Sequence, residues 1–191
     1  MKYRPIIMRA DEVRAILDGR KTQFRRPIKP QPVLTGFPGP HWPEHPRKPW
    51  MPVGGVYQDQ WQCPHGQPGD RLWVRETWRK GAVGTAAEYW ATVDALDWAL
   101  SRWSPSVHMP RWASRITLEI VRVRVERVQD ITEEDAINEG CVRELKLDGS
   151  IAWGVGLIEA REEFRNLWQS IHGTWDANPW VWVVEFRRVT K

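Results

Sequence analysis

The residues with the clearest chemical potential in this chain lie in one short segment, residues 18–26. It reads Asp-Gly-Arg-Lys-Thr-Gln-Phe-Arg-Arg, and five of its nine residues are charged. Guanidinium groups bind anions through several fixed donors, and a lysine in constrained surroundings can act in acid–base chemistry. The segment therefore indicates an anion-binding or acid–base site rather than a solvated loop.

The elements on either side should hold this segment in a fixed geometry. Residues 3–8 are predicted to form a strand, and Asp11 to cap a helix of about two turns that ends at Gly19. Residues 22–28 then look extended, with a proline at the strand end. Lys21 and Thr22 are thus expected to lie between the end of this helix and the following strand.

Positive charge is concentrated in the same part of the chain. The 191 residues carry a net charge of +4, but residues 1–31 hold nine Lys or Arg against three Asp or Glu, which gives +6 there and −2 in the remainder. A basic patch is typical of proteins that bind phosphate-bearing partners. A solvated basic surface is the alternative.

The chain is predicted to be a cytoplasmic protein. Its two cysteines, Cys63 and Cys141, imply no disulfide framework. The first residues do not resemble a signal peptide, and no apolar run is long enough for a membrane span.

The order of predicted elements favours an α+β fold in a single domain, residues 1–191. The longest strand signal covers residues 115–128, and its alternation changes parity at Ile120, which predicts a bend of the kind found in small barrels. Helices are expected at 132–140 and 158–172, the latter with Ile171 on its apolar face, and then a central apolar strand. We expect a small mixed β-barrel, closed or half-closed, with helices at its rim.

Two Trp- and Pro-rich stretches, at about 30–66 and 79–112, show no regular period and are interpreted as insertions into this domain. The chain has 14 tryptophans, and aromatic rings can either stack on nucleobases or fill a core. Most of them are predicted to pack in the protein.

Four segments, taken in order, resemble the ASCH domain family of the PUA-like superfamily. The first is the signature Gly19-x-Lys21-x-x-x-x-Arg26. The others are Pro-Gly-Asp-Arg-Leu-Trp-Val-Arg-Glu at 68–76, Ile-Thr-Glu-Glu-Asp-Ala-x-x-Glu-Gly at 131–140 and Asn-Pro-Trp-Val-Trp-Val at 178–183. The Trp/Pro-rich stretches and residues 108–115 resemble a phage- and prophage-encoded subgroup.

This resemblance implies a PUA-like barrel with a cleft for RNA or modified nucleotides. Bacterial members similar in this segment are amidohydrolases that remove the acyl group from N4-acetylcytidine, and a lysine, a threonine and a glutamate are implicated. The lysine corresponds to Lys21 and the glutamate to Glu139. The threonine corresponds to Phe24, which has no hydroxyl, so Thr22 is the nearest candidate.

The chemistry is consistent with these residue types. Amide hydrolysis requires an activated water or hydroxyl, a donor for the oxyanion and an acid for the leaving amine. Lys21 is predicted to act as base or oxyanion partner, Glu139 as proton shuttle and Thr22 as a catalytic hydroxyl. Without the resemblance, Lys21 and Glu139 would be interpreted as surface residues at helix ends.

Five further residues are predicted to contact substrate. Arg26 could bind a phosphate or a base edge, or pair with Glu76 or another strand carboxylate. Glu76 could accept a hydrogen bond from a cytosine amino group, and Trp78 could stack on the base or pack in the core. Arg75 and Ser114 are weaker candidates.

No cofactor and no metal are predicted. The chain contains ligand-type residues such as Cys63, His108 and His172, but not at paired-ligand spacing.

The leading hypothesis is a metal-independent amidohydrolase acting on N4-acylated cytidine or cytosine. The competing hypothesis is a non-catalytic module that binds RNA or modified nucleotides. A ribonuclease ranks lower, because the sequence offers no clear pair of acid–base histidines. The expected partner is a modified cytidine nucleoside or RNA, with no membrane, and the sequence does not set the oligomeric state.

Overall fold

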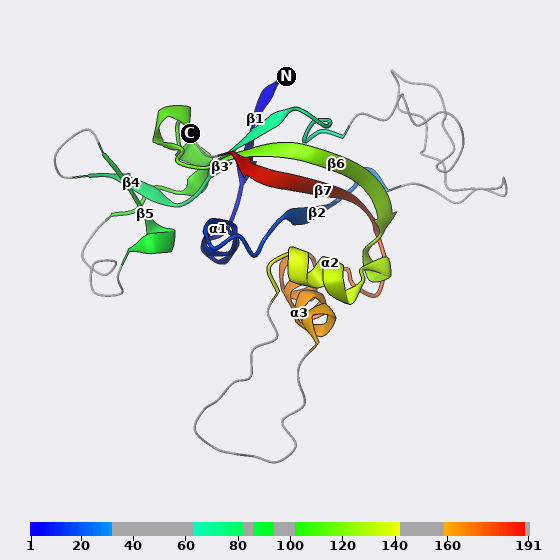
Figure 1. The fold of residues 1–191 in the computed structure, drawn as a ribbon. Helices are drawn as coiled ribbons and strands as arrows, with labels where there is room; N and C mark the ends of the chain where they lie inside the picture. Colours follow the sequence, from blue (N-terminus) through cyan, green and yellow to red (C-terminus); the bar gives the residue numbers. More distant parts are fainter. Residues whose placement is uncertain (32–62, 82–85, 94–101, 142–158, 190–191) are drawn as a thin grey trace, which may run out of the picture.

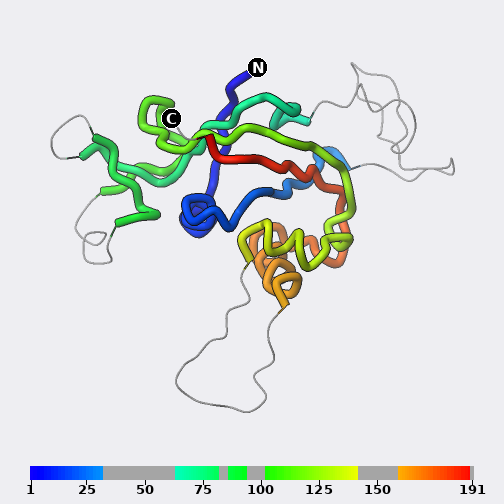
Figure 2. Tube along the Cα trace, in the orientation of Figure 1, coloured from blue at the N-terminus to red at the C-terminus, as the bar shows by residue number. Residues whose placement is uncertain are grey.

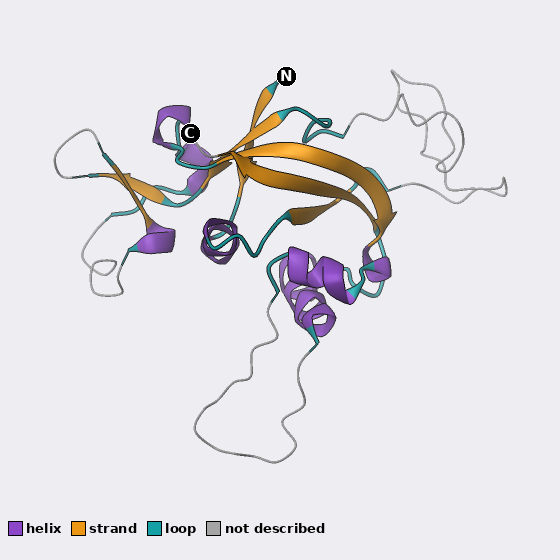
Figure 3. Cartoon of the chain, viewed as in Figure 1, coloured by secondary structure: helices purple, strands orange, loops and turns teal. Residues whose placement is uncertain are grey.

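The computed structural model of this chain describes residues 1–31, 63–81, 86–93, 102–141 and 159–189. Within these residues the chain forms a five-stranded sheet, a two-stranded hairpin and three α-helices (Figures 1 and 3). Most of the predicted insertion at 30–66, and part of that at 79–112, lie outside the described residues.

The main sheet is mixed and strongly curved (Figure 1). Its strands are β1 (Tyr3–Ile7), β2 (Gln23–Pro27), β3 (Arg71–Arg75), β6 (Thr117–Arg127) and β7 (Trp180–Val189). The order is β1-β3-β6-β7-β2, with only β1 and β3 parallel among these neighbours. The β6–β7 register shifts between Ile120 and Arg122, which confirms the predicted bend.

The sheet has β1 and β2 at its two ends, and no ladder joins them among the described residues. The side chain of Arg26 reaches across instead, and its Nη2 donates to the backbone oxygen of Ile7 at 3.3 Å. The α+β class is therefore confirmed, whereas closure of the sheet into a barrel stays a prediction.

Helix α1 (Ala10–Leu17) precedes the charged segment. Its N-cap is Arg9 and not Asp11, so the predicted cap is wrong by two positions. The backbone N–H of Arg9 donates to Glu12 Oε2 at 2.9 Å in a capping box, while Asp11 lies in the first turn, where it complements the helix dipole. Gly19, with a φ of +75°, follows the helix end as predicted.

Helix α2 (Glu133–Asn138) packs against α3 (Ala160–His172) at one end of the sheet (Figure 1). Thr132 is the N-cap, as predicted, and its hydroxyl accepts a hydrogen bond from the Asp135 backbone at 3.1 Å. The expected burial of Ile171 is wrong, because this side chain is 48% exposed beyond the apolar face formed by Phe164 and Trp168.

Strand β7 is buried on both faces, which confirms its predicted central place. Trp182, Val184 and Phe186 point into a core that also holds Phe24 and residues of α1. Val181 and Val183 point the other way, into a second core that packs against α2 and α3. In Figure 2 the blue β2 segment lies beside the red β7, and it shares this two-sided environment.

A small hairpin of β4 (Trp78–Lys80) and β5 (Ala87–Tyr89) projects from the main sheet on the left of Figure 1. Within the part of the chain that is described, no helix combines the length and hydropathy needed to span a membrane.

Candidate active site

Lys21 and Glu139 form a buried pair although 118 positions separate them in the sequence. The Lys21 ammonium donates to Glu139 Oε2 at 2.9 Å and to the Glu139 backbone oxygen at 2.7 Å. The two side chains are 3% and 5% exposed. Buried charges need such partners, because removing an ion from water costs several kcal/mol, as an order of magnitude.

Local backbone geometry brings the pair together. The parity of β2 places Gln23 and Arg25 on its α2-facing side, and Lys21, two residues earlier, points the same way. Gly140 follows α2 with a φ of +93°, and a Cβ there would lie 3.0 Å from Ala15 and 3.3 Å from Lys21. Glycine thus permits both the turn and the close approach of α2 to Lys21.

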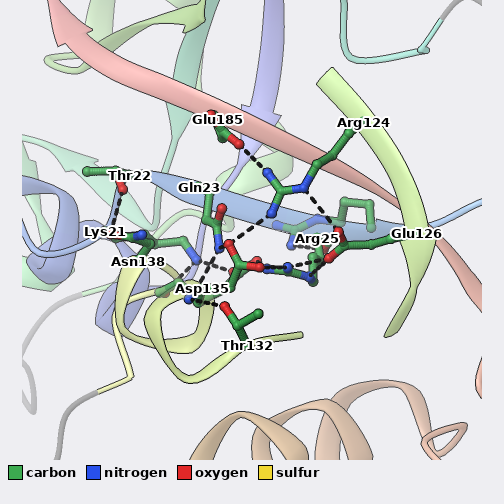
Figure 4. A network of polar contacts seen from close by, with 12 residues as sticks. Lys21, Thr22, Gln23, Arg25, Arg124, Glu126, Thr132, Asp135, Asn138 and Glu185 are labelled. Carbon is green, nitrogen blue, oxygen red and sulfur yellow. Dashed lines mark hydrogen bonds and ion pairs between the residues drawn. The ribbon is translucent and has the colours of Figure 1, made fainter. Parts of the chain in front are cut away.

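Arg25 connects this pair to a larger network of charged side chains (Figure 4). Its guanidinium donates to Glu139 Oε1 at 3.0 Å and to Asp135 at 3.1 Å, and it also pairs with Glu126. Arg124, on β6, pairs with two of these carboxylates, Glu126 at 3.0 Å and Asp135 at 2.8 Å. Four elements (β2, β6, β7 and α2) are tied together in this way, because Arg124 also pairs with Glu185.

The network alters the proton affinity of Asp135. Burial raises the pKa of Asp135, but the hydrogen bond from Gln23 and the charges of Arg25 and Arg124 lower it by more, so the net pKa lies below its usual value. Asp135 therefore remains an anion that holds Arg25 in place.

A cavity of about 530 Å³ lies beside the pair, between α1, the end of α2 and α3. Its wall includes Glu12 and Glu139. Its charged lining consists of five carboxylates and two guanidiniums, namely Asp11, Glu12, Asp18, Glu139, Glu163, Arg14 and Arg20. The cavity therefore favours a neutral or cationic ligand over a phosphate.

Cys141 also lines this cavity, but it is not a nucleophile. Burial raises the pKa of its thiol to about 12, and the negative charges of Glu163 and Glu139 act in the same direction. The thiol stays protonated at physiological pH.

The hydroxyl expected beside Lys21 is not directed at it. Thr22 is exposed, and its Oγ1 donates to Asn138 Oδ1 at 3.3 Å. Phe24 is fully buried in the apolar core, edge-on to His65 with ring centroids 5.4 Å apart. The position that the resemblance assigns to a threonine is thus a core position in this chain.

Arg26 lies near the pair but has neither of its predicted carboxylate partners. Its guanidinium lies 3.6 Å from Glu12, a helix residue, and over the ring of Phe24 at 5.2 Å. Glu76 is bound instead by Arg115, through two hydrogen bonds of 2.9 Å each. Of the two readings of Arg26, pairing with a strand carboxylate does not occur among the described residues, because its carboxylate neighbour Glu12 belongs to α1. Contact with substrate stays a prediction.

The other predicted contact residues gather around β3 and the hairpin, where each has protein partners. Arg75 donates to the Met109 backbone oxygen at 3.1 Å, and the Ser114 hydroxyl donates to that of Val74 at 2.8 Å. Trp78 packs edge-on against Trp112 at 5.5 Å. None of these residues, nor Glu76, lines the cavity beside Lys21.

Part of the basic excess of residues 1–31 is paired in the fold. Six of its nine basic side chains lie in ion pairs: Arg4, Arg9, Arg20, Lys21, Arg25 and Arg26. Arg4, Lys21 and Arg25 pair with carboxylates from outside this segment, whereas the partners of the other three are already included in the +6.

Sequence reasoning missed Arg25, Asp135, Glu12 and Arg124. Two signals could have found the first two. Strand alternation places Arg25 on the face of Lys21, and the four-residue spacing of Asp135 and Glu139 places both on one helix face. Glu12 and Arg124 have no comparable signal, because only the tertiary packing brings them here.

Among the described residues, no group of three or more His, Cys, Asp or Glu side chains is arranged to hold a metal ion.

The comparisons with known proteins add one structural likeness. Neither a family model nor a curated protein sequence matches the chain. The chain is similar to a solved structure described as an ASCH domain from Lactobacillus crispatus JV V101, with 15% sequence identity and a TM-score of 0.42. The match covers 98% of this chain and 79% of the other.

Proposed function

We propose that this protein is an amidohydrolase that removes the acyl group from an N4-acylated cytidine. The observation that carries the proposal is the buried contact of Lys21 and Glu139 beside a cavity, which unites the two residues that the sequence singled out. The resemblance of the Gly19–Arg26 segment to acetylcytidine amidohydrolases supports the same reaction.

Lys21 is suited to bind the oxyanion. Two of its donors are directed at Glu139, and the third faces Glu12 at 3.6 Å, beyond hydrogen-bond distance. A substrate carbonyl oxygen that enters from this side would accept that donor as negative charge develops. A neighbouring carboxylate would then move the proton from water to the leaving amine.

The cavity favours a free nucleoside over RNA. Its wall carries more carboxylates than guanidiniums, so a phosphate group would meet net repulsion. A neutral acylated cytidine would not.

The test is ultraviolet detection of cytidine formation from N4-acetylcytidine. Wild-type protein should turn the nucleoside over, with a lower kcat/KM for its 5′-monophosphate. Lys21→Met should reduce kcat by about 10²–10³-fold, as for loss of an oxyanion donor. Lys80→Met is the matched control, because Lys80 is an exposed lysine in β4. Absence of turnover by the wild type on acetyl and longer acyl derivatives would refute the proposal.

A second candidate, a non-catalytic module for modified nucleotides or RNA, is favoured by the buried Phe24. It predicts binding without turnover. Binding to RNA should then weaken steeply with salt, because phosphate contacts release counterions.

A further inference from the structure

Glu12 is a carboxylate that the sequence did not connect with the site, yet it lies against Lys21. Its Oε1 is 3.6 Å from the Lys21 ammonium and 3.6 Å from the Arg26 guanidinium. The side chain is 13% exposed and lines the cavity. Of the two carboxylates that neighbour Lys21 and line the cavity, Glu12 is thus the more exposed, since Glu139 is 5% exposed.

The two carboxylate oxygens of Glu12 make different contacts. Oε2 accepts a hydrogen bond of 2.9 Å from the Arg9 backbone and so fixes the side chain at the start of α1. Oε1 accepts no hydrogen bond from the described residues, because both of its cationic neighbours lie beyond hydrogen-bond distance. This oxygen is held in position but keeps its lone pairs available for water.

Glu139 differs in this respect. Its Oε1 accepts from Arg25 at 3.0 Å and its Oε2 accepts from Lys21 at 2.9 Å. Both oxygens are thus engaged by charged donors at hydrogen-bond distance. Its geometry is that of a residue that holds Lys21 in place.

We propose that Glu12 is the proton acceptor of this site, and that Glu139 is a positioning residue for Lys21. The inference depends on the proposed amidohydrolase function. Glu12 Oε1 takes a proton from water as the water oxygen bonds to the acyl carbon, and Lys21 donates a hydrogen bond to the oxyanion. The bond between the acyl carbon and N4 then breaks, and the proton passes from Glu12 to N4. The products are the carboxylic acid and cytidine.

Charged groups face Glu12 from every element packed around it. Lys21 and Arg26 face it from the segment before and within β2, each at 3.6 Å. The cavity wall adds Asp11, Arg14, Asp18 and Arg20 from α1, Glu139 from the end of α2, and Glu163 from α3. A general base accepts a proton only in its ionised form, so the proposed role predicts an acid limb in the pH profile of the wild type.

The decisive variant is Glu12→Gln, because a glutamine oxygen can still accept the hydrogen bond from Arg9 and preserve the capping box. We expect kcat for N4-acetylcytidine to fall by about 10²–10⁴-fold and the acid limb to disappear, with the urea unfolding midpoint unchanged. Formate should partly restore the activity of Glu12→Ala. Glu162→Gln, an exposed carboxylate of α3 outside the cavity lining, is the matched control and should behave as wild type.

Glu139→Gln should behave differently. It should lower both kcat and stability, since it leaves Arg25 and Lys21 without their shared anion, but it should keep the acid limb.

Three outcomes would overturn the assignment of Glu12. One is activity of Glu12→Gln within threefold of the wild type, which would leave the amidohydrolase itself standing as long as Lys21→Met is inactive. Another is a Glu12→Gln variant that loses activity and stability together but keeps the acid limb. This result would show that Glu12 only caps helix α1. The third is a wild type without turnover, which would remove the proposed function together with this inference.

Discussion

Glu76 and Glu139 are both buried carboxylates bound to arginine, but their surroundings differ. Glu76 is 2% exposed, and both of its oxygens accept hydrogen bonds from one guanidinium, that of Arg115, which also stacks on Tyr89 at 3.9 Å. Glu139 is shared between Arg25 and Lys21, and it lies on the wall of a cavity.

The difference shows what separates a structural ion pair from a candidate active site. In the Glu76 pair the bidentate geometry is complete, and a further guanidinium nitrogen of Arg115 donates to the Thr92 hydroxyl at 3.1 Å. We call Lys21, Glu12, Glu139, Arg25 and Asp135 the Lys21 cluster. In this cluster the Lys21 ammonium and one oxygen of Glu12 lie 3.6 Å apart without a hydrogen bond. An incomplete contact beside open space can accept a substrate, whereas a completed one can only stabilise the fold.

Replacement of Arg25 should have the largest effect on stability. Its side chain is fully buried and contacts three carboxylates, so Arg25→Met should lower the free energy of unfolding by about 3–5 kcal/mol, as for breaking a buried ion pair. It should also reduce activity, because Glu139 loses its anchor. Urea unfolding and the acetylcytidine assay measure the two effects.

Arg115→Met sharpens this comparison. It leaves a single carboxylate, Glu76, without its partner, and Arg115 is 25% exposed. We therefore expect the free energy of unfolding to fall by a smaller amount, about 1–3 kcal/mol, with no loss of activity in the folded protein. Equal losses of activity in Arg25→Met and Arg115→Met would contradict the distinction between the Lys21 cluster and the Glu76–Arg115 pair.

Asp135 should make the free energy of unfolding depend on pH in the acidic range. Because the folded pKa of Asp135 is lowered, the unfolded state binds more protons at acidic pH, and the free energy of unfolding rises with pH. The contribution is present above the unfolded pKa, at about 4, and is lost as pH falls through the folded value.

Asp135→Asn should therefore flatten the decrease in stability below about pH 4 and cost about 1 kcal/mol at neutral pH. Urea unfolding from pH 2.5 to 7 measures both. Asp130→Asn is the control, since Asp130 is an exposed aspartate just before α2. An unchanged acid slope in Asp135→Asn would show that the cluster does not carry this dependence.

Thr22→Ala should have the smallest effect. The hydroxyl is exposed and bonds to Asn138 at 3.3 Å, so we expect a stability change within about 0.5 kcal/mol and a kcat within twofold of the wild type. A loss of activity beyond tenfold in a stable variant would instead place this hydroxyl in the reaction.

Local sequence features predicted most of the elements. The capping threonine at 132, the glycine after α1 and the parity change at Ile120 all act through backbone geometry within a few residues, and each is confirmed. The N-cap of α1 was missed because arginine rarely occupies that position, and Glu12 completes the capping box instead.

The sequence by itself determined the α+β class and the central apolar strand, and its resemblance to a family singled out Lys21 and Glu139. Periodicity and turn chemistry are local, so they can be recognised without a structure. Only the tertiary structure decided which charges meet. It brought Glu12 and Arg25 to the Lys21–Glu139 pair, because ion pairs form between side chains whose distance is set by packing and not by sequence separation. The same packing buried Phe24 in the apolar core.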